Sequence, residues 1–501
     1  MRAHLAGVVV ACMAGGVAAQ SLEVRQPDIT TTPLPRSVVV GGTTYVDHGL
    51  VASGALPAGT IDFLGDTLGS FSSLQIEPGT WKREGDTYAG ILWTLPDRGR
   101  NDPEHNLFYD YAGRINRLRF SMTLSSTQKV GAVTLAPDGG TELKDFTGKP
   151  FTGAEPGAGT LKQHGIVLPS PASGTGAGKI SLDAESLQFI PGGGFYVGDE
   201  YAANVYQFNA RGQLGGILVP PKAVRPTGKD GKPYFTSLKP PATGRRNNQG
   251  VEGMALSPDG TRLFVMLQSA LLQDSAGTDG AGRAFTRVLV YDVTRDKTPS
   301  KPVGHYVVQL PVYDDLGKGG APTRTAAQSE IRVLDDHRFL MLTRDGSGWG
   351  AEGGRPIVFK SIVVVDTDGA ANLAGTAYES GTTSVLGQGG ALRAGVRAAT
   401  WKPLVNLLDP ADLARAGVSL ESGREGFTQL SEKWEAMDLL PSLDPAHPDD
   451  WFLIVGNDND FIAKHCLMEG QACDSPIDND NRLLVYRLTL PDMRSTTAPH
   501  H

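Results

Sequence analysis

Cysteine, charged residues and long apolar runs are all scarce in this chain of 501 residues. Charged residues make up only 20%, whereas the chain has 63 glycines and 33 prolines, a profile that fits a loop-rich β protein better than a helical one. Lysine and arginine (46) are outnumbered by aspartate and glutamate (54), giving a net charge of -8. Because general nucleic-acid binding requires a basic face, we expect no nucleic-acid partner.

Several common catalytic signatures are also missing. The sequence has no G-x-S-x-G nucleophile elbow. Its histidines are scattered without an H-E-x-x-H or H-x-H pattern, which argues against a zinc site. The stretch GTGAGKI (174–180) resembles a phosphate-binding loop but lacks the spacing of the first glycine and the Ser/Thr after Lys179. A Ser-His-Asp triad built from distant segments stays open, although no residue points to it.

The N-terminus has the pattern of a secretory signal. Arg2 and His4 precede an apolar run over residues 5–17, and Val17-Ala18-Ala19 offers a small-residue cleavage site. We expect a signal peptide over residues 1–19 and an exported protein, either periplasmic or extracellular. The alternatives are lipid attachment at Cys12 and a membrane anchor, although the run is shorter than the ~20 residues that a span needs. No other segment is apolar enough to predict a membrane span.

Cleavage after residue 19 leaves two cysteines, Cys466 and Cys473. In an oxidising compartment such a pair predicts a disulfide that closes a small loop, and two free thiols are the alternative. The loop directly follows the stretch NDND (457–460), so we expect the bridge to brace that stretch.

Four segments of the chain repeat one plan. A glutamate is followed by a short apolar strand, a tight turn, and a second apolar strand that ends in polar residues. A fifth, looser copy lacks the glutamate but ends in Asp97 and Arg98. Each unit continues with a third strand of alternating pattern, and repeats of this kind predict a β-propeller rather than a sandwich. The four repeated glutamates are Glu185, Glu252, Glu330 and Glu435.

The predicted fold is therefore all-β, a single propeller over residues 20–490. Five blades can be read from the repeats, and the intervals 74–185 and 330–435 leave room for another, so we expect about six. The run SVVVGGTTYV (37–46) is expected to supply a strand that closes the ring and removes an exposed sheet edge.

Three inserts are expected to form loops over the faces of the propeller. Residues 138–180 are rich in Gly and Ser, and residues 402–434 are predicted to hold a helix after Asp409-Pro410. Residues 219–250 are rich in Pro and in basic side chains, which would attract anionic substrates if this insert covers the channel, and would otherwise form a solvated loop. Residues 491–501 are predicted to be a disordered tail.

The repeated glutamates are the candidate functional residues. The first strand of each propeller blade lines the central channel, so these side chains are expected to meet around one axis. Facing carboxylates cannot all be ionised at neutral pH without a cation or basic residues to compensate. Calcium binds 6–8 oxygen ligands and suits such a ring, while Arg98, Arg332 and Arg344 lie at or near equivalent strand ends. The predicted metal ligands are Glu185, Glu252, Glu330, Glu435 and Asp458.

Each of these residues also has a structural interpretation. The NDND stretch is typical of a solvated turn, because Asn and Asp are common turn residues. Each glutamate is compatible with a structural hydrogen bond to a neighbouring blade. Asp458 is aligned with the other strand ends, which favours the site for this residue.

Several segments together resemble the phytase-like family, often described as "esterase-like activity of phytase". The resemblance covers residues 60 to 490 and implies an exported β-propeller that hydrolyses phosphoesters or other esters. The acidic DDPA-type signature of the calcium-dependent propeller phytases is missing, so the resemblance does not extend to phytate as the substrate. The matching segments are TLPDRG (94–99), AESLQF (184–189), GVEGMALSPDG (250–260), SEIRVL (329–334) and VGNDNDF (455–461).

Three functions follow from these observations. The first is an exported, calcium-dependent hydrolase of small phosphorylated substrates, in which Arg98, Arg344 and Glu252 are the predicted catalytic residues. The second is hydrolysis of a carboxylic ester or lactone at the same site. The third is a non-catalytic binding propeller with a structural calcium ion. In each case we expect a monomer.

Overall fold

The structure is a computed structural model that describes residues 24–25, 29–125, 130–276, 280–351, 353–491 and 493. The predicted signal peptide lies outside the described residues. So does the predicted tail, except for residues 491 and 493. No helix among the described residues is long and apolar enough to cross a membrane.

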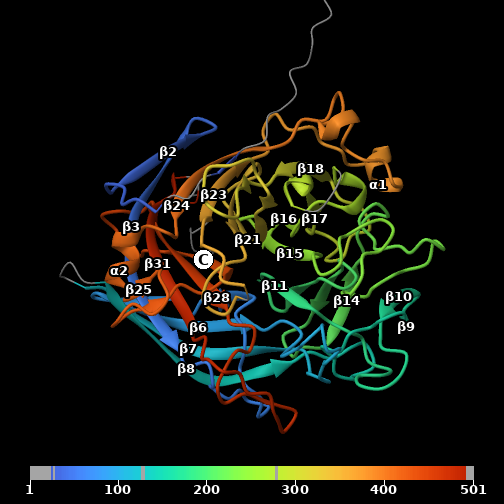
Figure 1. Cartoon of the computed structure of the whole chain (residues 1–501), viewed down its shortest axis with the longest axis horizontal. Coiled ribbons are helices and arrows are strands. Elements are labelled where there is room, and N and C mark those ends of the chain that lie inside the picture. The colour runs from blue at the N-terminus through green and yellow to red at the C-terminus, as the bar shows by residue number, and fades with distance from the viewer. Residues whose placement is uncertain are drawn as a thin grey trace, which may run out of the picture.

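Five four-stranded antiparallel units surround a common centre (Figure 1). We number these units as blades in the order of their first strands. Blade 1 consists of β4 (Ser73–Ile76), β6 (Thr87–Leu95), β7 (Arg114–Thr123) and β8 (Gly131–Glu142). Blade 2 consists of β11 (Ala184–Phe189), β12 (Phe195–Asp199), β13 (Val205–Phe208) and β14 (Leu214–Leu218). Blade 3 consists of β15 (Val251–Leu256), β16 (Arg262–Leu267), β17 (Phe285–Asp292) and β18 (Gly304–Gln309).

The remaining two blades complete the ring. Blade 4 consists of β21 (Ala327–Val333), β22 (Arg338–Arg344), β23 (Lys360–Asp366) and β24 (Thr400–Asn406). Blade 5 consists of β27 (Lys433–Pro441), β28 (Asp450–Asp458), β31 (Asn481–Thr489) and β3 (Thr43–Leu56). The first strands β4, β11, β15, β21 and β27 contact one another in this order, and β27 contacts β4, which closes the ring. The predicted β-propeller is therefore confirmed.

The ring contains the five blades that the repeats indicate, and no sixth blade is found in the described part of the chain. The interval 74–185 is occupied by blade 1 and by a hairpin of β9 (Thr160–Gln163) and β10 (Ile166–Pro169). The interval 330–435 is occupied by blade 4 and by the segments that follow it. The estimate of about six was one blade more than these residues form, because inserts fill the long intervals.

An N-terminal strand closes the ring, as predicted, but it begins later than expected. Strand β3 pairs antiparallel with β31 as the outer strand of blade 5, and its residues Ala52 and Ser53 pair parallel with β8 of blade 1. The start of the predicted run belongs instead to β2 (Arg36–Val40), which forms a hairpin with β3. Blades 1 and 5 are thereby joined at their outer edges as well as in the ring.

The core consists of one apolar cluster between each pair of neighbouring blades. Leu187 and Val197 of blade 2, for example, pack with Leu95 of blade 1, and equivalent clusters fill the other four junctions. Both faces of each blade are covered by its neighbours, which explains why these short strands are nearly continuous apolar runs. The blades thus hold their first strands in fixed positions around the channel.

Smaller elements decorate the faces of the ring. The helix predicted after Asp409 is present as α2, and the Asp409 side chain accepts hydrogen bonds from the backbone N–H groups of Ala411 and Asp412. Among the described residues the α-helices are α1 (Ala377–Ser380) and α2 (Pro410–Arg415), with short 3₁₀ turns at Leu272–Asp274, Ala281–Arg283 and Gln388–Gly390. The other strands are β1 (Val24–Arg25), β5 (Lys82–Glu84), β19 (Val312–Tyr313), β20 (Arg324–Thr325), β25 (Val418–Ser419), β26 (Thr428–Gln429), β29 (Leu467–Met468) and β30 (Gln471–Ala472).

Candidate metal centre

A β-bulge near the start of the first strand recurs in blades 2, 3 and 5. The extra residue of each bulge is a glutamate, namely Glu185, Glu252 and Glu435. A bulge inserts one unpaired residue and re-aims its side chain, so three equivalent bulges can direct three carboxylates toward one axis. The local irregularity of these strands is therefore what assembles the group.

The equivalent position in blade 4 is a serine. The bulge of β21 falls between Gln328 and Glu330, so the extra residue is Ser329 and Glu330 lies one position further on. The Glu330 carboxylate accepts a hydrogen bond of 2.7 Å from Ser73 Oγ and lies 3.2 Å from Arg332 Nη1. The structure therefore does not bring Glu330 into the group of the other three glutamates. Arg332 forms an ion pair with Glu330 and does not join that group.

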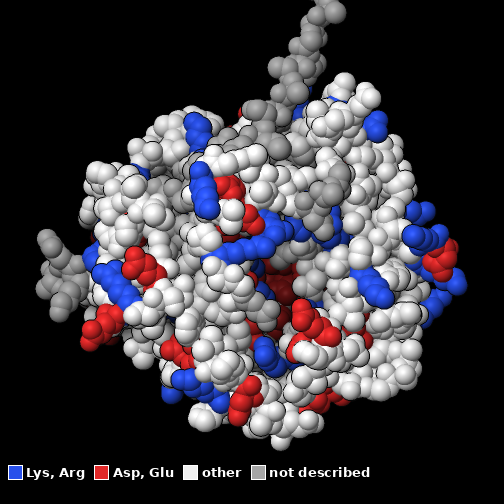
Figure 2. Space-filling view, viewed as in Figure 1, with Lys and Arg blue, Asp and Glu red and all other residues white. Residues whose placement is uncertain are grey.

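The three bulge glutamates form a compact, buried group. Glu185, Glu252 and Glu435 each offer one carboxylate oxygen, and these three oxygens lie within 4.8 Å of one another. The residues are only 8%, 2% and 3% exposed. Figure 2 shows acidic side chains inside a hollow at the centre of the ring and basic side chains around it.

The partners of these glutamates leave ligand atoms free. Gln268 Nε2 donates a hydrogen bond of 2.7 Å to Glu252 Oε1, while Glu252 Oε2 has no partner among the described residues. Arg344 Nη2 donates to Glu435 Oε1. The carboxylate of Glu185 has no hydrogen bond or ion pair within the described part of the chain. Buried polar groups are nearly always satisfied, so the unpartnered Glu252 Oε2 calls for an explanation.

A second group of carboxylates adjoins the first. One oxygen each from Asp97, Asp183 and Glu185 also lie within 4.8 Å of one another. Arg98 Nη1 donates a hydrogen bond of 2.9 Å to Asp183 Oδ2. The predicted residue Arg98 thus lies at the centre of the molecule, bound to a carboxylate that the sequence analysis did not single out.

Asp458 belongs to a third group, together with Asp97 and Asp460. It is 2% exposed and accepts hydrogen bonds from Ser72 Oγ at 3.3 Å and from the backbone of Asp460 at 2.6 Å. Lys433 Nζ lies 2.5 Å from Asp460 Oδ1 and 4.0 Å from Asp458 Oδ2. Strand β28 therefore delivers Asp458 to the centre, where it lies between the Lys433 ammonium group and Glu435.

Lys433 and Asp183 were not predicted as site residues, although the sequence contains a pattern that could have identified both. Each precedes a bulge glutamate by two residues, in KWE (433–435) and DAE (183–185). An alignment on the glutamates alone places them at the same position of their blades. Their opposite charges hid this correspondence.

Burial and mutual repulsion oppose ionisation of these carboxylates. Burial raises the pKa of Glu185 and of Glu252 well above the ordinary value, and the neighbouring carboxylates raise it further. Burial also raises the pKa values of Asp97 and Asp183 to about 7. Burial opposes the ionisation of Glu435 too, but Arg344 and Lys433 outweigh it and hold the pKa of Glu435 below its ordinary value.

The first group fits a hard divalent cation. Calcium binds oxygen ligands at 2.3–2.6 Å, so two ligands on opposite sides of an ion are about 5 Å apart. The oxygens of Glu185, Glu252 and Glu435 lie within 4.8 Å of one another, close enough for all three to contact one ion. The unpartnered Glu252 Oε2 is the kind of atom that a cation would satisfy. All the donors are carboxylates, which favours calcium or magnesium over softer metals.

The stability of the metal-stripped protein is expected to fall as the pH rises from about 4 to 7. In the folded state the pKa values of Asp97 and Asp183 are about 7, against 3.8 for exposed aspartate. The folded protein therefore holds more protons than the unfolded chain across this window, and raising the pH removes that advantage. Calcium should reduce the fall, because it compensates the ionised form.

Thermal unfolding at several pH values, with calcium and after removal of metal, tests this expectation. The variant Asp183→Asn should show a smaller fall between pH 4 and 7 than the natural chain. A stripped protein whose unfolding temperature rises steadily through the same window would contradict the expectation.

Glu330→Gln is expected to lower stability by about 1–3 kcal/mol without affecting metal binding. The substitution weakens the buried contacts of Glu330 with Arg332 and Ser73, which lie outside the three carboxylate groups. Chemical denaturation measures the first effect, and calcium titration the second. Loss of calcium binding in a folded Glu330→Gln protein would return this residue to the site.

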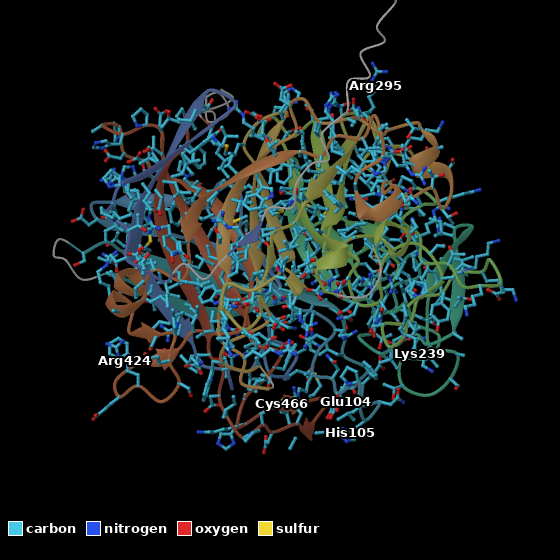
Figure 3. The ribbon with its side chains drawn as sticks, turned by 45° about the horizontal axis from the view of Figure 1, so that its top comes forward. Glu104, His105, Lys239, Arg295, Arg424 and Cys466 are labelled. Carbon is cyan, nitrogen blue, oxygen red and sulfur yellow. A yellow bond between two sulfur atoms is a disulfide. The ribbon has the colours of Figure 1, made fainter. Side chains whose placement is uncertain are left out.

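The predicted disulfide is confirmed, and its cysteines pack against Ala58 and Ala463. Cys466 and Cys473 are bonded with a Cα–Cα distance of 4.8 Å. Within their loop, Leu467 donates a backbone hydrogen bond of 2.8 Å to Thr67 Oγ1, which ties the loop to the segment before blade 1. Figure 3 shows Cys466 toward the lower rim of the molecule. Bracing of the NDND stretch itself by this bridge remains a prediction.

The basic insert is anchored by one of its own arginines. Arg245 is fully buried and donates hydrogen bonds to the carbonyl oxygens of Tyr201 and Phe235. Lys239 of the same insert lies at the outer edge of the molecule in Figure 3. Attraction of anions by this insert remains a prediction.

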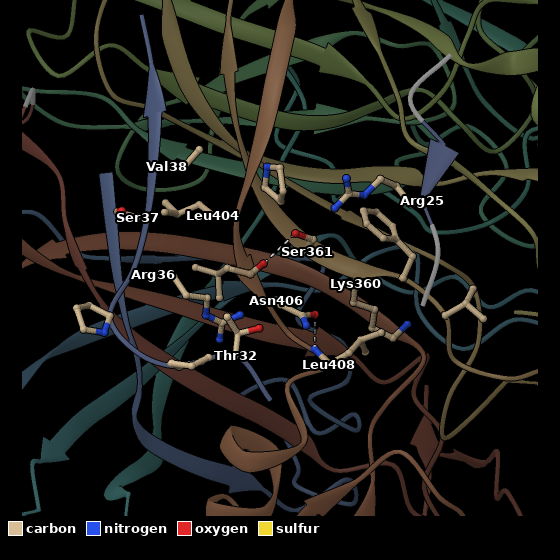
Figure 4. Close-up of a pocket in the computed structure, with 16 residues that line it drawn as sticks. Arg25, Thr32, Arg36, Ser37, Val38, Lys360, Ser361, Leu404, Asn406 and Leu408 are labelled. Atoms are coloured by element: carbon tan, nitrogen blue, oxygen red, sulfur yellow. Dashed lines mark hydrogen bonds between the residues drawn. The ribbon is translucent and has the colours of Figure 1, made fainter. Parts of the chain in front are cut away.

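A further pocket lies outside the channel, beside β2 and β24 (Figure 4). Its volume is about 460 Å³. Two of its basic side chains are already paired: Arg36 with Asp409 at 3.2 Å, and Lys360 with Asp345 at 2.7 Å. It contains none of the three carboxylate groups, so the channel remains the candidate site.

Comparisons with known proteins agree with export. A protein of Arthroderma benhamiae described as an "Uncharacterized secreted protein" is 31% identical over 478 residues, which cover 87% of this chain and 91% of the relative. Its description as secreted supports an exported protein here.

The solved structures that match are only weakly similar to this chain. A β-xylosidase, RS223, covers 86% of this chain and 94% of its own at 11% identity and a TM-score of 0.30. A PQQ-bound aldose sugar dehydrogenase of Streptomyces coelicolor covers 91% of this chain and 100% of its own at 12% identity and a TM-score of 0.28. Neither TM-score is high enough for the similarity to inform the fold or the function of this chain.

A protein family matches most of the chain. Residues 67–461 match the phytase-like family, described as "Esterase-like activity of phytase". This range includes all seven carboxylates of the three groups. The chain therefore belongs to the phytase-like family.

Proposed function

We propose that the chain is an exported, calcium-dependent hydrolase of small phosphoesters that acts in the central channel. The observation that carries this proposal is the group Glu185, Glu252 and Glu435, three buried carboxylates from three blades with oxygens within 4.8 Å. The family description supports ester hydrolysis, and the secreted relative supports export.

The three glutamates would hold the ion. Calcium, when bound, would polarise the phosphoryl oxygen and lower the pKa of a bound water. Gln268 holds Oε1 of Glu252 and leaves Oε2 as the available ligand atom. Arg344 fixes Glu435 in its ionised form through their ion pair.

Two arginines would bind the phosphoryl group. Arg98 and Arg344 are each paired with a carboxylate, yet Nε of both is buried without a hydrogen-bond partner among the described residues. Guanidinium N–H groups match phosphate oxygens in geometry and charge. They would neutralise the negative charge that develops as water adds to phosphorus and the bond to the ester oxygen breaks.

Hydrolysis of a carboxylic ester or lactone at the same site is the second candidate. The ion pairs of Arg98 with Asp183 and of Arg344 with Glu435 favour it, because they offset the positive charge that a phosphate would need. A carboxylic ester requires polarisation of its carbonyl group but no strong anion site.

The test uses residues 20–501, purified and assayed with calcium and with EDTA. Phosphate release is measured on a panel of phosphomonoesters and phytate, and ester cleavage on lactones and aryl acetates. Calcium-dependent phosphate release that is lost in Arg98→Met supports the proposal. Ester cleavage alone, unaffected by Arg98→Met, supports the second candidate. Calcium binding without either activity contradicts both and leaves a binding propeller.

A further inference from the structure

We infer that the channel binds a second divalent cation, held by Asp97, Asp183 and Glu185, with Glu185 shared between the two ions. This inference rests on the calcium site of the proposed function and adds a second ion to it. The oxygens of the second group lie within 4.8 Å of one another, as do those of the first. Glu185 is the one residue that belongs to both groups.

The second group contains a buried carboxylate oxygen that a cation would satisfy. Asp183 is 1% exposed, and Arg98 binds its Oδ2, but its Oδ1 has no partner among the described residues. Within the described part of the chain, Asp97 accepts hydrogen bonds only on Oδ1, from the backbone of Gly99 at 2.9 Å and from Ser70 Oγ at 3.4 Å. A buried carboxylate oxygen without a partner is costly, and a bound cation removes that cost.

Glu185 is suited to bridge the two sites. Its carboxylate is buried, has two oxygens, and has no hydrogen bond or ion pair within the described part of the chain. A carboxylate can give one oxygen to each of two ions. Hydrolases with two ions about 4 Å apart use them to clamp the attacking and the leaving oxygens of a phosphoester.

The first two groups carry an excess of negative charge. Together they contain five different carboxylates. Two cationic side chains, Arg98 and Arg344, form ion pairs with them. The carboxylates therefore outnumber the paired cations, and divalent cations would compensate the remaining charge.

The third group, by contrast, already has its cation. The ammonium of Lys433 lies 2.5 Å from Asp460 and 4.0 Å from Asp458. Asp460 is also more exposed, with 30% of its side chain accessible. This group therefore needs no metal ion, and it supplies a matched control for the other two.

Calcium titration of the metal-stripped chain over residues 20–501 tests the inference. Calorimetry measures the affinity, and native mass spectrometry counts the bound ions. We expect two ions per chain in the natural protein, one in Asp183→Asn, one in Glu252→Gln and two in the control Asp460→Asn. Glu185→Gln should weaken both sites. Circular dichroism and thermal unfolding show that each variant is folded.

The outcomes separate this inference from the proposed function. A single ion in the natural protein, lost in Glu252→Gln and kept in Asp183→Asn, overturns the second site and leaves the first. Two ions in a folded Asp183→Asn protein also overturn it. If Asp183→Asn does not fold, Asp97→Asn takes its place, with the same expected loss of one ion. Two bound ions without any hydrolysis support the inference while the proposed function fails.

Discussion

Replacing Glu252 by glutamine is expected to lower calcium-dependent phosphate release by roughly 100-fold or more. The substitution keeps the shape of the side chain, and Gln268 can still donate its hydrogen bond to the amide oxygen. It removes the negative charge and the unpartnered Oε2 that we assign to the ion. Rate measurements over a range of calcium concentrations separate weaker ion binding from slower chemistry.

Glu330→Gln is the matched control for this result. Glu330 is also a buried glutamate at the start of a first strand, but it binds Ser73 and Arg332 instead of joining the three glutamates. It should keep the natural rate despite its lower stability. A folded Glu252→Gln protein that releases phosphate at the natural rate would remove the channel ion from the reaction.

A chain that begins at residue 57 is expected not to fold. It lacks β3, which is the outer strand of blade 5 and also pairs with β8 of blade 1. Without β3 the edges of β31 and β8 are exposed, and unpaired edges promote association with other chains. Thermal unfolding followed by circular dichroism should show no cooperative transition.

A chain that begins at residue 29 is the control for this truncation. It loses β1 but keeps β2 and β3, so it should unfold cooperatively and bind calcium. If the chain from residue 57 also unfolds cooperatively and binds calcium, closure by β3 is not needed for the ring.

The repeated glutamates predicted both the ring and most of its central group. Glu185, Glu252 and Glu435 start equivalent strands, so a repeat in the sequence became a group in space. Glu330 was misaligned by one residue, because Ser329 occupies the bulge position of blade 4. A shift of one residue sends a strand side chain to the opposite side, and apolar pattern alone does not place a bulge.

The NDND stretch is not the solvated turn that the sequence allowed, because Asn457, Asp458 and Asn459 are at most 2% exposed. Asp458 reaches the carboxylates at the centre. Asn457 Oδ1 accepts a hydrogen bond from the backbone of Arg482 in β31, and Asn459 Oδ1 accepts one from the backbone of Phe461 in the turn, so both asparagines hold neighbouring backbone. Residue type alone could not divide these roles, since Asn and Asp suit both turns and oxygen ligation.

Locating the bound calcium ion is the most direct test of the proposed metal centre. Crystals of the chain over residues 20–501, grown with calcium and measured at a long X-ray wavelength, would give an anomalous difference map that locates bound calcium. We predict a peak in the channel within 2.3–2.6 Å of oxygens of Glu185, Glu252 and Glu435. A fully calcium-loaded crystal with no peak among these three residues would contradict a metal-centred channel.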